Sequence, residues 1–484
     1  MNFARDVVEA APPERLALIE LARDGRRREW SFGEVASCSA RLAGVLATRH
    51  DIRRGDVVMT LIGSRPEWVL TMVACFRLGA VTLACNEQLR AHDLAHRIAL
   101  ARPKVIVADE RDLSELSAAG PPCDVLTVPD DRIFDAAQEL DPAPPVELEP
   151  HDPCLITFTS GTTGEPKGVI HGQRYLPGQR LQAEHWLDAR AGEIVWCTAA
   201  TGWSKSARNA FIAPWLRGAA ALLHDERFDP QRRFEVLVSE HVNVLCMAPT
   251  EYRVMAKRVE LHPVPGLRSL VAAGEALNPE VIRAFQEATG LEIRDGYGQT
   301  ETGQLTANPL DQPVRPGSMG RPLPGVDLRV QDGELVLGDP STDPTFFVGY
   351  VDGGPAPVHE PWRTGDRVTR DEDGYLYFEG RTDDVIISAG YRIGPFEVES
   401  ALVSHSAVAE AAVVAAPDEE RGAVVRAVVV LRDGFAPGEA LAAELQEHVK
   451  HETAPYKYPR IVEFADELPK TASGKIQRAR LRRT

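Results

Sequence analysis

Short apolar runs that end at turn-forming residues recur along this chain and constrain its fold more than any other feature. They occupy residues 105–108, 154–158, 219–223, 242–246 and 269–273. Longer amphipathic stretches lie between several of them, and in residues 32–47 the apolar side chains recur at helical spacing. Uniformly apolar runs are typical of strands buried on both faces. Their alternation with helices predicts a layered α/β architecture.

The character of the sequence changes after this α/β region. Residues 118–150 are rich in Pro, Asp and Ala, and we expect them to cross between two α/β units. Gly and Pro become dense in residues 315–361, which predicts a small β-rich subdomain. The end of the chain combines expected strands at 411–416 and 424–431 with a helix at 439–452. This pattern predicts a compact α+β domain.

Composition narrows the range of partners. The 484 residues carry 54 Lys and Arg against 71 Asp and Glu, a net charge of -17, whereas non-specific nucleic-acid binding needs a basic surface. The seven cysteines form no CxxC pair and show no metal-ligand spacing. The N-terminus lacks the pattern of a signal peptide, and no apolar run approaches the ~20 residues of a membrane-spanning helix. We therefore expect a cytoplasmic protein with neither nucleic-acid partners nor a membrane span.

The strongest local signal is Thr-Ser-Gly-Thr-Thr-Gly-Glu-Pro-Lys-Gly at residues 159–168, directly after an apolar run. Its glycines allow a ligand to approach the backbone, while N–H groups, hydroxyls and a lysine can donate to phosphate oxygens. The spacing differs from that of a Walker loop. The residues of this predicted phosphate cradle are Thr159, Ser160, Gly161, Thr162, Thr163, Gly164 and Lys167.

This loop closely resembles the signature of the acyl-adenylate-forming superfamily, which includes acyl-CoA synthetases, aryl-CoA ligases, firefly-type luciferases and adenylation domains of peptide synthetases. The resemblance spans roughly residues 32–482, and further motifs follow in the family's order. It implies that the protein uses ATP, Mg²⁺ and coenzyme A. The reaction would join a carboxylic acid to AMP with release of pyrophosphate, and would then transfer the acyl group to the thiol of coenzyme A.

Residues 296–302, Gly-Tyr-Gly-Gln-Thr-Glu-Thr, resemble the family's second signature. The resemblance implies that Tyr297 lies against adenine, that Thr300 contacts the α-phosphate and that Glu301 helps to hold magnesium. A divalent cation would relieve the repulsion between the attacking carboxylate and the phosphate. The other nucleotide contacts that the family pattern implies in this part of the chain are Gly274, Glu275, Ala276, Asp295 and Gly296.

Two later motifs complete the nucleotide site in the family's pattern. Trp-Arg-Thr-Gly-Asp at residues 362–366 resembles the ribose-binding motif, in which Asp366 accepts hydrogen bonds from the two ribose hydroxyls. Gly-Arg-Thr-Asp-Asp follows at residues 380–384. The resemblance implies that Arg381 also reaches the nucleotide and that Asp383 is a hinge.

The resemblance also divides the chain. It implies an N-terminal AMP-binding and acyl-binding domain over residues 1–380, a hinge over 381–384 and a mobile α+β C-terminal domain over 385–484. During thioester formation Gly390 would border the pantetheine tunnel and Arg392 would contact phosphate. Lys475, near the C-terminus, would be the catalytic lysine of adenylation, because a cation there stabilises charge that develops in the transition state.

These motifs constrain the identity of the carboxylic acid substrate less than they constrain the nucleotide chemistry. Thr-Gly-Trp-Ser-Lys-Ser-Ala at residues 201–207 resembles the medium-chain acyl-CoA synthetase branch, in which Trp203 would line the acyl pocket. Arg208 and Asn209 follow where that branch commonly has an aromatic and small residues. Arg208 could face solvent, or it could pair with a second polar group of the substrate.

A medium-chain or branched acid is our leading prediction. Three alternatives stay open: an aryl-CoA ligase, a stand-alone adenylating enzyme that loads a carrier protein, and a non-catalytic nucleotide-binding protein. The predicted partners are thus a small carboxylic acid, ATP and coenzyme A, and a homodimer is also considered.

Overall fold

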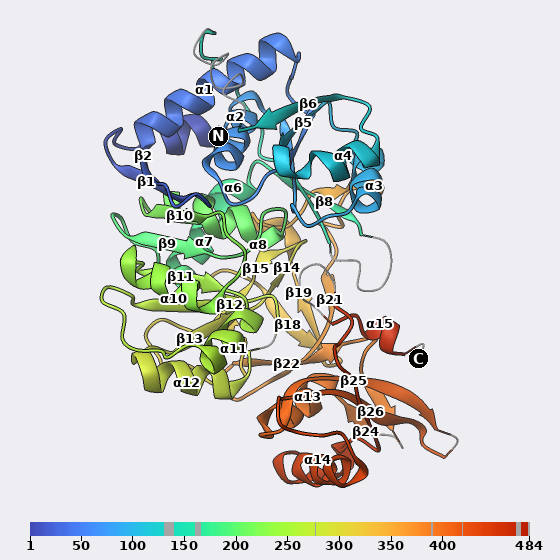
Figure 1. The fold of residues 1–484 in the computed structure, drawn as a ribbon. Coiled ribbons are helices and arrows are strands. Elements are labelled where there is room, and N and C mark those ends of the chain that lie inside the picture. The colour runs from blue at the N-terminus through green and yellow to red at the C-terminus, as the bar shows by residue number, and fades with distance from the viewer. Residues whose placement is uncertain are drawn as a thin grey trace.

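Two seven-stranded sheets form the frame of the N-terminal part of the chain (Figure 1). In the first sheet the strands lie in the order β13 (Ile293–Gly296), β12 (Ser269–Ala273), β11 (Val244–Met247), β9 (Ile194–Cys197), β10 (Ala220–His224), β1 (Leu16–Leu21) and β2 (Arg27–Ser31). In the second sheet the order is β20 (Gly349–Tyr350), β8 (Gly168–Gly172), β7 (Pro153–Phe158), β4 (Val81–Cys85), β3 (Val57–Leu61), β5 (Val105–Asp109) and β6 (Asp124–Val128).

Both sheets are parallel except at one edge. In the first sheet β2 pairs with β1 in antiparallel orientation, and in the second sheet β8 and β20 are antiparallel to their neighbours. This computed structural model describes residues 1–129, 140–159, 166–275, 277–388, 391–418, 420–470 and 476–482. No helix in those ranges combines the length and the apolar character needed to cross a membrane.

Helices cover both sheets. Helices α1 (Phe32–Arg49) and α2 (Pro66–Leu78) lie between the sheets, where their apolar side chains join both in one core. The outer face of the first sheet packs against α10 (Pro230–Ser239), α11 (Pro249–Arg258) and α12 (Pro279–Thr289). The outer face of the second sheet packs against α3 (Ala91–Ala101) and α4 (Leu113–Ala119). The layered α/β architecture predicted from the sequence is confirmed.

Short helical segments fill the rest of the N-terminal part. They are η1 (Ala4–Glu9), η2 (Glu110–Asp112), α6 (Tyr175–Gly178), α7 (Arg180–Gln182), η3 (Ala183–Leu187), α8 (Ser204–Ala207), η4 (Arg208–Ile212), α9 (Ala213–Trp215) and η5 (Pro340–Thr342). The segment from α8 to α9 packs into the core between the two sheets. Within this segment α8 lies at the carboxyl end of β9, where Cys197 Sγ donates to the Lys205 carbonyl at 3.5 Å, and ligand sites form at that edge of parallel sheets.

Each of the five predicted apolar runs overlaps a strand, and residues 32–47 lie in α1. The prediction that residues 118–150 cross between two α/β units is wrong, because β6 within this segment pairs in parallel with β5 and the next strand, β7, belongs to the same sheet. The first four residues of β6 are exposed or half-buried, with Val128 buried at its end. An edge strand with that exposure does not need a continuous apolar run, so the pattern used for buried strands missed it.

A separate antiparallel sheet follows, and its strands lie in the order β18 (Leu328–Gln331), β19 (Glu334–Leu337), β21 (Trp362–Arg370) and β22 (Leu376–Arg381). It has its own apolar core and confirms the predicted β-rich subdomain, although the strands continue past residue 361. Short two-stranded pairings connect it to the first sheet, formed by β14 (Gly298–Gln299) with β15 (Gly303–Gln304) and β16 (Thr306–Ala307) with β17 (Arg321–Pro322).

The C-terminal part forms a small α+β domain with its own core, drawn in orange and red in Figure 1. Its sheet consists of β25 (Val408–Asp418), β26 (Gly422–Leu431) and β27 (Ile461–Phe464). The domain also contains β23 (Ile386–Ser388), β24 (Tyr391–Ile393), α13 (Pro395–Ser404), α14 (Glu439–Glu452), η6 (Pro455–Lys457) and α15 (Arg478–Leu481). The helix predicted at 439–452 coincides with α14, and the α+β class of this domain is confirmed.

Candidate functional site

A cavity of about 1530 Å³ lies at the carboxyl ends of the parallel strands, between the N-terminal part and the C-terminal domain. Residues that directly follow several strands of both sheets line it, which is the edge where ligand sites form in open α/β sheets. Most of the site residues predicted from the sequence lie on its wall. These are Thr159, Lys167, Trp203, Gly274, Glu275, Asp295, Gly296, Tyr297, Thr300, Glu301, Asp366, Arg381 and Asp383.

Other predicted site residues lie outside the described residues, so their placement is not tested. These are Ser160, Gly161, Thr162, Thr163, Gly164, Ala276, Gly390 and Lys475. The backbone of Arg392 belongs to β24, and its side chain is not described. The ends of the predicted phosphate cradle do meet, because the Thr159 N–H donates to the Lys167 carbonyl at 2.9 Å. The Lys167 N–H donates in turn to the Thr159 hydroxyl at 3.2 Å.

Asp366 is the centre of a polar cluster on the cavity wall. Its Oδ2 accepts from the Tyr297 hydroxyl at 2.5 Å and from Gln299 Nε2 at 2.8 Å, and its Oδ1 accepts from Arg381 at 3.1 Å. Asp366 and Arg381 face each other in the register of β21 and β22. Burial raises the pKa of Asp366, and the Arg381 guanidinium opposes that rise. The cluster brings together three of the predicted nucleotide contacts.

Replacing Asp366 by alanine should raise the KM for ATP about 10- to 100-fold, because hydrogen bonds to a charged group are worth about 1.5–3 kcal/mol. Pyrophosphate release measured against ATP concentration checks this. Glu379→Ala on the neighbouring strand is a matched control, since Glu379 makes only a long contact of 3.8 Å with Arg367 and is about one-third exposed. An unchanged KM in Asp366→Ala would contradict the predicted ribose contact.

Glu301 and Lys167 approach each other through Tyr350 on β20. The Tyr350 hydroxyl donates to Glu301 Oε1 at 3.1 Å, and Lys167 Nζ lies 5.6 Å from the centroid of the Tyr350 ring. Burial and the neighbouring Glu301 raise the pKa of Tyr350, so its hydroxyl remains a donor at neutral pH. The residue predicted to hold magnesium and the predicted phosphate lysine therefore contact the same tyrosine.

The described residues contain no group of three His, Cys, Asp or Glu side chains that could hold a metal ion by themselves. Magnesium usually takes one or two protein carboxylates together with substrate phosphates. Glu301 would supply the carboxylate. The bound ion would neutralise phosphate charge as the acid attacks.

Two side chains that the sequence did not single out support the site from behind. His171 on β8 is buried, and its Nε2 donates to the Thr300 carbonyl at 2.9 Å. Burial lowers the pKa of His171 to about 3, so the ring is neutral. Its Nε2–H then acts as the donor that fixes the Thr300 carbonyl. Lys205 Nζ donates to the Ala273 carbonyl at 3.1 Å, at the end of β12 and next to Gly274. Lys205 lies within the quoted 201–207 motif, whereas nothing near His171 in the sequence indicated its partner.

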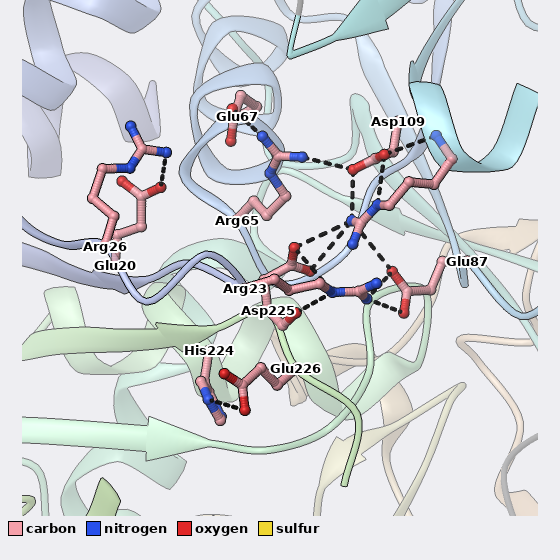
Figure 2. Close-up of polar contacts among 11 residues, drawn as sticks. Glu20, Arg23, Arg26, Arg65, Glu67, Glu87, Asp109, His224, Asp225 and Glu226 are labelled. Carbon is pink, nitrogen blue, oxygen red and sulfur yellow. Dashed lines mark hydrogen bonds and ion pairs between the residues drawn. The ribbon is translucent and has the colours of Figure 1, made fainter.

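A network of charged side chains joins the two sheets at the rim of the cavity (Figure 2). Arg111 is its hub and contacts Asp109 at 2.6 Å and Asp225 at 3.2 Å. Arg23 follows β1 and contacts Glu87 at 3.2 Å and Asp225 at 3.5 Å. Asp109 ends β5 of one sheet and Asp225 follows β10 of the other. The network therefore fixes the two strand edges that carry the site relative to each other.

The C-terminal domain presents its last motif to the same cavity. Lys470 and Ile476 pair as an antiparallel bridge on either side of residues 471–475, and both line the cavity. Arg478, also on the wall, pairs with Glu399 at 2.7 Å. By contrast, Tyr391 of β24 is 53% exposed and stacks on a neighbouring tyrosine at 4.4 Å away from the wall. Among the described residues, the flanks of the adenylation motif line this cavity, whereas β23 and β24 do not.

Comparisons with known proteins show the family of this chain. The family model for AMP-binding enzymes matches residues 5–340, and the model for the AMP-binding enzyme C-terminal domain matches residues 397–475. The chain is 40% identical to acyl-coenzyme A synthetase ACSM4, mitochondrial, of Rattus norvegicus, over 99% of this chain and 90% of the relative. It is 38% identical to the uncharacterized acyl-CoA ligase YtcI of Bacillus subtilis (strain 168), over 98% of this chain and 94% of the relative.

Among solved structures, the chain is similar to the anthranilate CoA ligase AuaEII in complex with anthranoyl-AMP. The TM-score is 0.88 at 28% sequence identity, over 99% of this chain and 96% of that chain. The similarity therefore includes both the N-terminal part and the C-terminal domain. Because the family model covers more than half of the chain and the relatives match it from end to end, the chain belongs to the AMP-binding enzyme family and is an AMP-forming ligase.

Proposed function

We propose that this protein is an acyl-CoA ligase that activates a medium-chain or branched carboxylic acid. In the first step the carboxylate attacks the α-phosphorus of ATP, forming acyl-AMP and releasing pyrophosphate. In the second step the thiol of coenzyme A attacks the acyl carbon, forming the thioester and releasing AMP. The observation that carries the proposal is the single cavity, whose wall collects the predicted contacts for adenine, ribose, phosphate and magnesium.

The residues divide this chemistry among them. The cluster of Tyr297, Asp366 and Arg381 would hold the nucleoside, while Lys167 and Thr300 would contact phosphate oxygens. Holding acid and phosphate in one orientation removes most of the entropic barrier to their reaction. These roles follow from the family resemblance and from the placement of the side chains on one wall.

The size of the acid is proposed from Trp203, which lies on the cavity wall at the start of α8. The relative from Rattus norvegicus carries the name of an acyl-coenzyme A synthetase. An aryl-CoA ligase is the second candidate, supported by the structural similarity to the anthranilate CoA ligase. A cytoplasmic location stays a prediction, since the Rattus norvegicus relative is named mitochondrial. The homodimer also stays a prediction.

A screen for pyrophosphate release tests the proposal. Purified protein is given ATP and Mg²⁺ with short, medium, branched or aromatic acids, and either coenzyme A or a phosphopantetheine-bearing carrier protein as the acceptor. We expect the fastest turnover with a medium-chain or branched acid and coenzyme A. Turnover confined to aromatic acids would favour the second candidate. Acyl transfer only to the carrier protein would overturn coenzyme A as the acceptor.

We also propose that residues 381–384 act as the hinge between domains over 1–380 and 385–484. The chain turns there, because the N–H groups of Asp384 and Val385 both donate to the Arg381 carbonyl, at 3.0 and 3.2 Å. Lys470 and Ile476, which flank the segment with the predicted adenylation lysine, line the cavity, whereas Tyr391, next in sequence to the predicted thiol-step glycine, is exposed and not on its wall. Both surfaces can serve one site only if the small domain rotates between the two half-reactions.

Asp383→Pro should slow acyl transfer from preformed acyl-AMP to coenzyme A more than it slows ATP–pyrophosphate exchange. Proline fixes φ near about −65° and restricts the residue before it, so the hinge loses the freedom that rotation needs. Stopped-flow measurement of each half-reaction separates the two steps. Asp383→Ala is the matched control, because it removes the carboxylate and keeps the backbone freedom. Equal losses in both half-reactions would count against a hinge at this position.

A further inference from the structure

Arg208 is a buried cation on the cavity wall that the proposed two-step reaction does not use. It begins η4 and is only 4% exposed. Its Nε and Nη1 have no hydrogen-bond partner within the protein, and no carboxylate among the described residues forms an ion pair with it. Burying a charge without a partner is costly. A guanidinium that is buried without a partner therefore indicates a functional role.

A second buried arginine on the same wall shows how the fold normally treats such a group. Arg233 is 5% exposed, pairs with Glu251 at 3.3 Å and lies over the Trp196 ring at 4.8 Å. Its charge is therefore balanced inside the protein. Lys205, one helical turn before Arg208, is also occupied, because its Nζ donates to the Ala273 carbonyl. Arg233 Nε also lacks a hydrogen-bond partner, but its charge is paired, whereas Arg208 forms no ion pair with a described residue and leaves both Nε and Nη1 without a partner.

The neighbours of Arg208 place it between two predicted parts of the acid site. On one side is the turn that begins at Thr300, because a Cβ added to Gly303 would lie 3.6 Å from Arg208 Nη1. On the other side is Trp203, five positions earlier in the same helical segment, which lines the predicted acyl pocket. An acid whose carboxylate lies at Thr300 and whose chain runs along Trp203 would pass Arg208.

The residues around Arg208 favour a ligand group that accepts hydrogen bonds over a hydrocarbon chain. The Tyr175 hydroxyl is buried beside Arg208, whose guanidinium opposes the rise that burial causes in the Tyr175 pKa, and it forms no hydrogen bond of normal geometry within the protein. His171, packed on the Tyr175 ring at 4.0 Å, directs its Nε2 proton at the Thr300 carbonyl and is neutral. Among the described residues, Arg208 therefore has a neutral hydroxyl beside it and no carboxylate paired with it. A purely apolar acyl chain would leave these donors unsatisfied.

We propose that Arg208 binds a second electron-rich group of the acid, a carboxylate or a carbonyl oxygen, so that the substrate is a bifunctional acid. The planar guanidinium matches a carboxylate with two parallel hydrogen bonds and stays charged at every physiological pH. The inference rests on the proposed acyl-CoA ligase activity and deepens it by naming the class of acid. Arg208 would select the substrate, and the chemistry at the reacting carboxylate would remain that of the family.

Matched pairs of acids test the inference. The full chain is assayed for pyrophosphate release and for calorimetric binding with the linear dicarboxylates from malonate to sebacate, each beside the monocarboxylate of equal length. The ω-oxo acids of the same lengths form a third arm, which distinguishes a carbonyl from a carboxylate. At one chain length or more, we expect the bifunctional acid to exceed its monofunctional match about 10-fold or more in kcat/KM.

Arg208→Met should lower kcat/KM for the preferred bifunctional acid about 10- to 100-fold and leave the monofunctional match within about twofold. Arg208→Lys keeps the charge but loses the two parallel donors of the guanidinium. Its kcat/KM for the bifunctional acid should therefore lie between that of the wild type and that of Arg208→Met. Thermal unfolding is the structural readout. Because Arg208→Met removes a buried charge and leaves no partner behind, its melting temperature should equal or exceed that of the wild type.

Three results would overturn the inference. They are equal turnover and binding of both acids of every pair, equal losses with both acids in Arg208→Met, and a clear drop in its melting temperature. Equal losses would mean that Arg208 acts on the reacting carboxylate or shapes the site. Failure of the proposed function is different: no acid would release pyrophosphate, while calorimetry would still report whether Arg208 discriminates between the two acids of each pair.

Discussion

Lys475→Ala is expected to abolish acid-dependent ATP–pyrophosphate exchange while leaving thioester formation from preformed acyl-AMP largely intact. The family resemblance assigns to Lys475 the role of stabilising the negative charge that develops as the carboxylate attacks phosphorus. Loss of such a donor typically costs about 3 kcal/mol or more, which slows the step about 100-fold or more. The thiol step starts from acyl-AMP, where that charge has already left with pyrophosphate. The two half-reactions should therefore respond differently.

The flanks of the motif support this division. Residues 471–475 lie outside the described ranges, but Lys470 and Ile476 on either side pair with each other and line the cavity. The described flanks of the motif thus border the same cavity as the predicted nucleotide contacts. Exchange of labelled pyrophosphate into ATP measures the first half-reaction, and thioester formation from synthetic acyl-AMP measures the second.

Lys450→Ala is the control for a lost lysine in the same domain. Lys450 lies on α14, pairs with Glu447 three residues before it and packs on the Tyr458 ring at 4.3 Å. Exposed pairs of this kind are worth less than about 1 kcal/mol, so both half-reactions should stay near wild type. If Lys475→Ala lost both half-reactions to the same extent, the assignment of Lys475 to adenylation alone would be wrong.

The sequence predicts this protein best where the information is local. Residues 439–452 carry a helical pattern and form α14, and residues 269–273 carry an apolar run and form β12. Periodicity is set by neighbours in the chain, so it can be read without the fold. The site residues were found for another reason, because their spacing within each motif matches a known family. The structure brings the described members of these motifs to one cavity.

The sequence fails where a residue's role depends on a distant partner. His171 holds the Thr300 carbonyl from 129 positions away, and no pattern around His171 indicates this. Asp225 and Arg111 meet across 114 positions because parallel strands of two different sheets end side by side. Arg208 departs from its branch visibly in the sequence, but only the structure places it in the core with its donors unpaired. Pairing of this kind is fixed by topology and not by spacing.

Arg111→Met is expected to cause a large loss of stability, because it removes the hub of the charge network at the rim of the cavity (Figure 2). The Asp109 side chain is fully buried and that of Asp225 is 9% exposed. Removing one partner of a buried ion pair leaves an uncompensated charge and typically costs about 3–5 kcal/mol. Arg65 still contacts Asp109 at 2.7 Å, so we expect the lower end, about 3 kcal/mol.

Thermal unfolding followed by tryptophan fluorescence measures this loss. For a chain of this size, about 3 kcal/mol corresponds to a fall in melting temperature of about 3–4 °C. Arg26→Met is the matched control in the same figure: Arg26 is 59% exposed and contacts Glu20 at 3.6 Å, so its loss should cost less than about 1 kcal/mol. Equal falls in melting temperature for the two substitutions would show that Arg111 contributes no more to stability than the exposed Arg26.

The pH dependence provides an independent check on the cause. Burial alone would raise the pKa of Asp109, but Arg111 and Arg65 hold that pKa below its ordinary value. A lowered pKa stabilises the folded state at pH values above the ordinary pKa of about 4, and this contribution is lost as the pH falls through the lowered pKa.

Without Arg111, Asp109 should protonate at a higher pH, which relieves the uncompensated charge. The difference in melting temperature between wild type and Arg111→Met should therefore be largest near neutral pH and should narrow in acid. A difference that stayed constant from pH 7 to pH 4 would mean that lost packing of the Arg111 side chain, and not its charge, is the cause.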